Sequence, residues 1–141
     1  MINSRSLADL HPRVFTLATA FLTAAMKQDI DLIVTSTFRD NESQAILYAQ
    51  GRTTPGRIVT NAKPGHSFHN WRVAFDVVPV AHGKCIWDGP IWDTIGALGQ
   101  SCGLEWGGAW TTFPDRPHFQ QTFNMTIQDF LDGKTIPMED A

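Results

Sequence analysis

The chain has 141 residues, of which 43% are hydrophobic and 18% charged, and its formal net charge is −3 at pH 7. This composition is that of an ordinary globular protein of one domain, and a weakly acidic chain without a Lys/Arg run excludes a nucleic-acid binder. The N-terminal residues lack the apolar core of a signal peptide, and no apolar run reaches the roughly 18 residues that cross a bilayer.

The first half of the chain predicts two helices separated by a strand. Residues 11–28 carry apolar side chains at intervals of three and four, the pattern of a helix with one buried stripe. The β-branched and apolar residues 30–38 predict a strand. A second helix over residues 40–50 begins at a capping Asp or Asn. The Gly-, Pro- and Thr-rich residues 51–65 predict a long loop, and such loops are often functional in compact domains.

The second half predicts short strands and helices. The run Val73–Val78 is the strongest strand, and Pro79, which cannot donate to a ladder, is expected to end it. Gly103 is expected to stop a helix over residues 90–102. The other expected elements are a turn at 81–84, strands at 104–108 and 118–123, and a helix at 126–131. This order predicts the α+β class, with a small antiparallel sheet and flanking helices.

The two cysteines are 17 residues apart, at Cys85 and Cys102. A bridge between them is conceivable, but in a reducing cytoplasm we expect two buried free thiols. Neither belongs to a C-x-x-C pair or adjoins a His, so a cysteine nucleophile has little support.

Two short segments carry the residues suited to chemistry. The first, Ser-Phe-His-Asn-Trp-Arg-Val-Ala-Phe-Asp, contains His69 and Asp76; the second, Asp-Arg-Pro-His, contains Asp115 and His118. Two histidines and one carboxylate can hold a zinc ion and leave one position open, the arrangement of catalytic rather than structural zinc sites. The second carboxylate is then left over to move protons.

Each of these residues also has a simpler interpretation. His69 and Asp76 are seven residues apart, so in one continuous strand their side chains would face opposite sides. They can meet only if His69 lies in a loop before the strand. Asp76 interrupts an apolar strand, where an unpaired carboxylate is unfavourable, but strand alternation also permits a solvent-facing Asp. Asp115 alone could be a surface turn residue paired with Arg116, and His118 alone a core or surface histidine.

The ordered pattern Ser-x-His-x-x-x-x-Ala-x-Asp followed by Asp-x-x-His resembles the zinc D-Ala-D-Ala carboxypeptidase and L-alanyl-D-glutamate endopeptidase family. The segments Ser-Thr-Phe-Arg at 36–39, Leu-Tyr-Ala-Gln-Gly-Arg-Thr at 47–53 and Glu-Trp-Gly-Gly-Ala-Trp at 105–110 agree with it. The resemblance covers about residues 35–120. It implies the fold that D-Ala-D-Ala dipeptidases share with hedgehog domains, and it leaves a tail, 126–141, too short for a separate wall-binding domain.

The resemblance also implies a role for each residue of the site. His69, Asp76 and His118 match the family's zinc ligands. Asp115 matches the general base, which takes a proton from the attacking water and returns it to the leaving amine. Arg39 matches an arginine near the metal, where a fixed guanidinium can stabilise the oxyanion of the tetrahedral intermediate.

Further positions match the family less closely. Ser67 and Gln44 match positions near the substrate, and Trp106 is expected to shape the wall behind the metal, with a core aromatic as the equal alternative. Arg72 stands where the family usually has Gly, a residue that implies close backbone approach or an unusual dihedral angle. Arg72 must therefore point outward or contact an acidic substrate. His66 is an alternative metal ligand because it lies so close to His69.

The implied function is a zinc-dependent peptidoglycan hydrolase that cleaves the L-alanyl-D-glutamate bond of stem peptides. A single domain, 1–141, without a signal peptide suits a monomeric phage endolysin. It would remain in the host cytoplasm until a separate protein permeabilises the membrane, with no membrane or nucleic-acid partner of its own. Two alternatives remain: a D-alanyl-D-alanine carboxypeptidase, which usually needs export, and a non-catalytic zinc-stabilised wall-binding module, since fold does not determine function.

Overall fold

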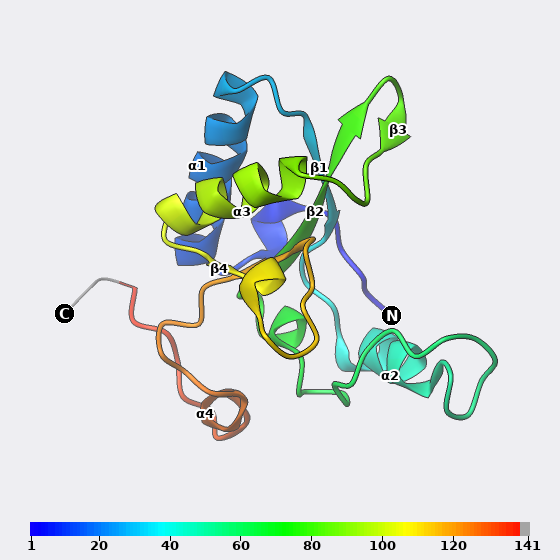
Figure 1. Cartoon of the computed structure of the whole chain (residues 1–141). Coiled ribbons are helices and arrows are strands. Elements are labelled where there is room, and N and C mark those ends of the chain that lie inside the picture. The colour runs from blue at the N-terminus through cyan, green and yellow to red at the C-terminus, as the bar shows by residue number, and fades with distance from the viewer. Residues whose placement is uncertain (139–141) are drawn as a thin grey trace.

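An antiparallel sheet lies at the centre of the computed structural model, which describes residues 1–138 (Figure 1). Four strands follow the order β1-β2-β5-β4, and β3 pairs with the far end of β2. The strands are β1 (Leu32–Ser36), β2 (Ala74–Ala81), β3 (Lys84–Cys85), β4 (Glu105–Trp106) and β5 (His118–Gln120). Every pair is antiparallel, so the predicted α+β class is confirmed.

Among residues 1–138, four α-helices and three 3-10 helices surround the sheet. The helices are α1 (Pro12–Lys27), α2 (Asn41–Ala49), α3 (Ile91–Ser101) and α4 (Ile127–Leu131), and the 3-10 turns are η1 (Leu7–Asp9), η2 (Phe68–Trp71) and η3 (Gly107–Ala109). Figure 1 shows α1 and α3 together on one side of the sheet, whereas α2 and α4 lie toward opposite ends of the molecule. Within residues 1–138 no helix combines the length and the apolar character that a bilayer crossing demands.

The core lies between α1, α3 and one face of the sheet. Phe21 of α1 packs against Phe75 of β2 and Phe119 of β5, with ring centroids 6.2 and 4.6 Å away. All three rings are fully buried, as is Trp92 at the start of α3. Because side chains alternate along a strand, the neighbours of these strand residues point to the opposite face of the sheet. Asp76 is one of them.

Pro79 does not end β2, contrary to the expectation from sequence. The carbonyl oxygen of Pro79 accepts from Ile86 N at 2.8 Å, so the backbone at this position faces the β3 side rather than β1. The missing N–H therefore removes no bond from the β1 ladder. The ladder resumes where Val80 N donates to Asp31 O at 2.8 Å, and β2 continues to Ala81. His82 and Gly83, both with positive φ, then form the predicted turn into β3.

The cysteines are free, as predicted, but only one is even partly covered. Cys85 is exposed and Cys102 is half-buried. The expectation of burial is wrong for Cys85 because β3 is a two-residue strand at the margin of the sheet, and both of its residues are exposed.

The C-terminal segment packs under the turn that precedes β2. Phe130 of α4 stacks on Trp71 of η2, with ring centroids 5.5 Å apart and an interplanar angle of 16°. Phe68, also of η2, packs against the Phe130 ring in a T-shaped arrangement, with ring centroids 6.2 Å apart. Ile136 is buried, and Arg13 Nη1 of α1 donates to Pro137 O at 2.8 Å. The C-terminal segment from Phe130 to Pro137 thus packs against the domain, and Phe130 contacts two aromatic residues of η2.

Replacing Phe130 by Ala should remove these contacts. We expect the free energy of unfolding to fall by about 3 kcal/mol, the cost of truncating a buried Phe. Phe15→Ala is the matched control, because Phe15 is 41% exposed on α1, and it should change stability by no more than about 0.5 kcal/mol. Urea denaturation of both variants checks this, and equal losses would contradict it.

Candidate metal centre and active site

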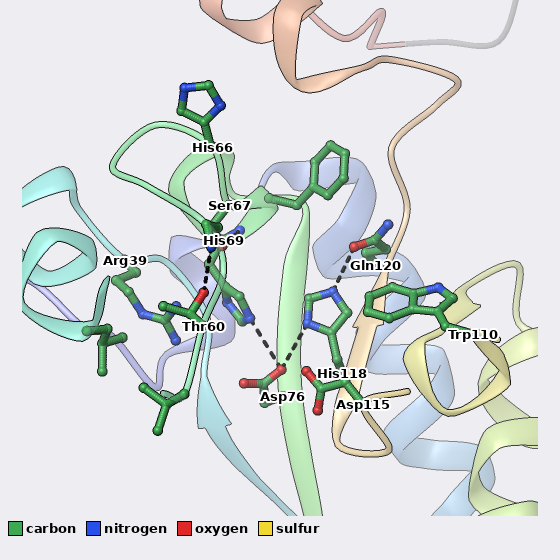
Figure 2. Close-up of a pocket in the computed structure, with 14 residues that line it drawn as sticks. Arg39, Thr60, His66, Ser67, His69, Asp76, Trp110, Asp115, His118 and Gln120 are labelled. Atoms are coloured by element: carbon green, nitrogen blue, oxygen red, sulfur yellow. Dashed lines mark hydrogen bonds and ion pairs between the residues drawn. The ribbon is translucent and has the colours of Figure 1, made fainter. Parts of the chain in front are cut away.

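Three side chains from three elements meet on the open face of the sheet. Asp76 on β2 and His118 on β5 are directly opposite one another in the strand register. His69 reaches the same point from η2, the turn before β2. Because His69 lies outside the strand, its side chain can lie beside Asp76 although the two residues are seven positions apart. Asp76 Oδ1 lies 3.3 Å from His69 Nε2 and 3.2 Å from His118 Nδ1 (Figure 2).

The second nitrogen of each imidazole is already engaged. His69 Nδ1 lies 2.9 Å from Thr37 O, a carbonyl that can only accept, so this nitrogen carries the proton. His118 Nε2 lies 2.7 Å from Gln120 Oε1 and donates to it. His69 Nε2 and His118 Nδ1 therefore direct lone pairs toward Asp76. Outer partners of this kind orient metal-binding histidines.

The donor set fits a divalent metal. Asp76 Oδ1 is buried and, despite its two close nitrogens, has no hydrogen-bond partner. Two nitrogens and one oxygen, all within 4.8 Å of one another, can converge on a single ion. Three ligands of these types with one position left open are the arrangement of catalytic zinc. His69, Asp76 and His118 thus form a His-Asp-His metal site.

Electrostatics favour the ionised carboxylate at this site. Burial works to raise the pKa of Asp76, but the adjacent His69 and His118 outweigh it and hold the pKa well below its ordinary value. Burial likewise works to lower the pKa of His118, and the contact with Asp76 outweighs it, so that this pKa is raised. Asp76 is therefore ionised, as a carboxylate that binds a metal must be.

Local sequence explains the shape of η2. Ser67 caps the turn by accepting from His69 N, and Asn70 completes a capping box by accepting from Ser67 N. Asn70 also donates to Arg39 O at 2.8 Å. The turn ends at Arg72, which adopts a left-handed φ of 66°. This left-handed φ explains why the family usually has Gly at this position.

The side chain of Arg72 points away from the site. Its guanidinium lies 3.8 Å over the Phe38 ring and donates to Asp9 O at 2.8 Å. Arg72 does not line the pocket around Asp76. Of the two interpretations that the sequence allowed, the outward one is therefore the observed one.

Asp115 stands at the rim of the metal site, in the loop that leads into β5. Asp115 N donates to Gly107 O at 2.9 Å, and His118 N donates to Asp115 O at 3.2 Å. A Cβ on Gly107 would lie 2.4 Å from Asp115 O, so this close approach requires glycine. The residue is exposed as a whole, but its carboxyl lines the pocket, and the partial burial raises its pKa although His118 opposes the shift.

Arg39 is held on the opposite side of the pocket. Its Nη1 donates to Gln44 Oε1 at 3.0 Å and its Nη2 to Ser36 Oγ at 3.2 Å. Gln44, fully buried, is fixed in turn by donating to Ala62 O at 2.8 Å. Nε of Arg39 is buried and has no hydrogen-bond partner. Figure 2 shows the guanidinium extending from Arg39 toward His69.

These residues surround one cavity of about 370 Å³. Of the site residues expected from the sequence, six line it: Arg39, Ser67, His69, Asp76, Asp115 and His118. Gln44 lies behind Arg39 and Trp106 lies behind the loop, and neither reaches the cavity surface. His66 stands at the rim and points away from the metal ligands in Figure 2, and the metal site does not include it.

Trp106 is a packing aromatic, which was the alternative to a role in the wall behind the metal. Its indole donates to Arg116 O at 2.8 Å, and its ring fills the space that a Cβ on Gly96 of α3 would occupy. The large aromatic residues that line the cavity are Phe68 and Trp110, and the Trp110 ring lies 5.2 Å from that of His118. The sequence interpretation assigned no role to Trp110 or to Gln120. Both lie within residues 35–120, the range of the family resemblance, and the sequence carried no other indication of them.

Comparison with known proteins places this arrangement in a family. Two models described as D-alanyl-D-alanine carboxypeptidase match residues 60–121 and 7–90, and the first range contains His69, Asp76, Asp115 and His118. The chain is also 38% identical, over 127 residues, to the peptidoglycan L-alanyl-D-glutamate endopeptidase CwlK of Bacillus subtilis, covering 83% of this chain and 76% of the relative. The chain belongs to the D-alanyl-D-alanine carboxypeptidase family. It is a metallopeptidase.

Solved structures agree on the fold of this metallopeptidase. The L-Ala D-Glu endopeptidase ChiX of Serratia marcescens superposes with a TM-score of 0.64 at 26% identity and covers 92% of both chains. The D,D-pentapeptidase VanY of a VanB-type resistance cassette, solved as a complex with Zn(II), has a TM-score of 0.61 at 15% identity. It covers 86% of this chain and 83% of its own, and at that identity the likeness concerns the fold alone.

Metal affinity of the metallopeptidase should fall in acid. Its histidines bind metal only when neutral, and the pKa of His118 is raised above its ordinary value of 6.5. Below the raised pKa, one proton must leave for each metal bound, so affinity should weaken about tenfold per pH unit. Asp76 stays ionised throughout because its pKa is lowered.

Competition with a chromophoric chelator at a series of pH values measures this slope. The variant His82→Asn is the control, because His82 lies in the turn between β2 and β3 and outside the metal site. It should keep the same slope. An affinity independent of pH in the acid range would exclude His118 as a ligand.

Proposed function

We propose that this protein is a zinc-dependent peptidoglycan hydrolase that cleaves the L-alanyl-D-glutamate bond of stem peptides. The observation that carries the proposal is the convergence of a His-Asp-His metal site, a carboxyl group and a guanidinium on one cavity. The relatives CwlK and ChiX are both named for this bond, and the first of them is 38% identical to the chain. Two imidazoles and one carboxylate with an open position are a ligand set of catalytic zinc sites.

The residues around the cavity divide the work of peptide hydrolysis. Zinc bound by His69, Asp76 and His118 would supply a Lewis acid for the scissile carbonyl and for activation of water. Asp115 takes a proton from the attacking water, and its raised pKa brings its basicity closer to neutral pH. The same carboxyl then donates that proton to the departing amine. Arg39 faces the developing negative charge with a fixed guanidinium.

The shape of the cleft favours an endopeptidase. A second cavity of about 670 Å³ adjoins the first, and the two share Val59, Thr60, Trp110 and Asp115. Ile58 and Phe113 line the far part. An enzyme that cuts within a chain needs room on both sides of the scissile bond, and a cleft that continues past Asp115, the proposed proton donor to the amine, provides room on one of them.

A D-alanyl-D-alanine carboxypeptidase is the second candidate, because both matching family models carry that description. Such an enzyme must recognise a terminal carboxylate, for which a cationic side chain is the usual partner. Among residues 1–138, Arg39 is the one Lys or Arg that lines either cavity. Arg39 is placed beside the metal, so no second cation marks a closed end of the cleft.

A non-catalytic wall-binding module is the third possibility. Such a module gains nothing from a general base or from an oxyanion partner beside an open metal position. Asp115 is held at the rim by Gly107, and Arg39 is fixed by Gln44 and Ser36. The fixed positions of Asp115 and Arg39 beside the metal site therefore support a catalytic role.

We further propose that the hydrolase serves as a phage endolysin, which waits in the host cytoplasm and reaches the wall once the membrane is permeabilised. The support for this role is the motifs that resemble the L-alanyl-D-glutamate endopeptidase family, on which the expectation of an endolysin rests. Cytoplasmic expression in a bacterium should cause lysis only when a pore-forming protein is coexpressed. Lysis without the pore, or none with it, would argue against the role.

Neutralising the proposed base should separate metal binding from turnover. We expect Asp115→Asn to keep zinc and to lose activity by at least about 100-fold, the range of a general base. Asp88→Asn is the matched control, because Asp88 is 98% exposed and outside both cavities. Zinc content and initial rates measure the effect, and an active Asp115→Asn variant would remove Asp115 from the mechanism.

Mass spectrometry of purified peptidoglycan, digested with and without a chelator, tests the bond. We expect chelator-sensitive release of peptides that begin at D-glutamate. Loss of one terminal D-alanine would instead identify the carboxypeptidase. An unchanged digest from zinc-loaded protein would favour the binding module.

A further inference from the structure

A chain of polar contacts continues outward from the metal ligand His118. His118 Nε2 donates to Gln120 Oε1 at 2.7 Å, and Gln120 Nε2 donates to Glu105 Oε2 at 3.2 Å. Trp110 Nε1 donates to the same carboxylate oxygen at 2.8 Å. The strand register explains the alignment: Asp76 is opposite His118, and Gln120 is opposite Glu105, so the chain crosses from β2 through β5 to β4.

The direction of the Gln120 amide decides which nitrogen of His118 is protonated. With Oε1 toward the ring, the amide accepts a proton from Nε2 and leaves the lone pair of Nδ1 for a metal. With the amide turned over, its NH₂ group would donate to Nε2 and the ring proton would move to Nδ1. Nδ1 lies 3.2 Å from the carboxylate of Asp76, which attracts a proton there. A proton on Nδ1 blocks the ligand atom.

Glu105 is suited to prevent that turn. An ionised carboxylate can only accept, so it holds the NH₂ group of Gln120 and directs Oε1 toward His118. Gln120 is 4% exposed, and both ends of its amide are already bonded, to His118 and to Glu105. Because Glu105 accepts from the NH₂ group of this amide, the oxygen at its other end is directed toward His118 and accepts from it.

We propose that Glu105 is a positioning residue that selects, through Gln120, the tautomer of His118 competent to bind metal. This inference rests on the metal use in the proposed function and adds to it a control of ligand protonation. The shared oxygen also holds the indole of Trp110, whose ring lies 5.2 Å from that of His118. One carboxylate thereby orients both a metal ligand and one of the large aromatic residues that line the cavity.

Glu105→Gln tests the proposal with little change of shape. An amide at this position both accepts and donates, so it no longer selects one direction for Gln120. We expect zinc affinity, measured by chelator competition, to weaken about tenfold, as for other partners that orient a metal ligand. Glu42→Gln is the matched control, because Glu42 is 69% exposed at the start of α2, and it should keep the affinity of the unmodified protein.

Exchanging the two groups separates direction from charge. In the double variant Glu105→Gln, Gln120→Glu, the carboxylate accepts from His118 and from the amide at 105, and the oxygen of that amide accepts from Trp110. A carboxylate at position 120 can only accept from His118, so we expect the double variant to recover the zinc affinity that Glu105→Gln loses.

Proton–nitrogen NMR of the zinc-free protein at about pH 9, where free imidazoles are neutral, reports the tautomer directly. We expect the His118 proton on Nε2 in the unmodified protein and on Nδ1 in Glu105→Gln. An unmodified protein with the proton on Nδ1, unchanged affinity in Glu105→Gln, or a double variant as weak as Glu105→Gln would overturn the proposal. None of these measurements involves substrate, so an inactive enzyme would not affect their outcome.

Discussion

The contact between Asp76 and His118 across two strands is the constraint on which the rest of the structure depends. These residues are opposite one another in the β2–β5 ladder, and the adjacent pair in the same ladder is Phe75 with Phe119. Phe75 and Phe119 pack against Phe21 in the core. A slip of one residue would therefore move the phenyl rings to the cleft and the metal ligands to the core. The hydrophobic core thus enforces the register that assembles the site.

Placing a carboxylate and two imidazoles on a partly buried face creates a requirement for polar partners. The structure meets it by fixing each second nitrogen: Thr37 O accepts from His69, and Gln120 accepts from His118. Asp76 Oδ1 has no hydrogen bond of its own. The pattern is that of a preorganised metal site, where ligands are oriented before the ion arrives and less reorganisation accompanies binding.

Family membership establishes that the protein is a metallopeptidase, but it does not determine which bond of the peptidoglycan is cleaved. Endopeptidases and carboxypeptidases both resemble this chain, so the bond must be inferred from what surrounds the metal. Here the cavity continues beyond Asp115 between the loop with Ile58 and the loop with Phe113, and Arg39 is its one lining cation among residues 1–138. Those loops, rather than the sheet, differ most easily within a fold.

The sequence by itself determined the α+β class, most elements to within a few residues, and the residues that form the metal site. It could do so because periodicity and capping are local, and because a specific ordered motif names its own residues. Only the tertiary structure decided that β2 runs through Pro79, since this depends on which neighbour the proline nitrogen faces. It also decided that Arg72 points outward, that Trp106 is a packing residue while Trp110 lines the cavity, and that Glu105 reaches His118 through Gln120. These are relations between residues distant in sequence, and no local pattern encodes which side chains a register brings face to face.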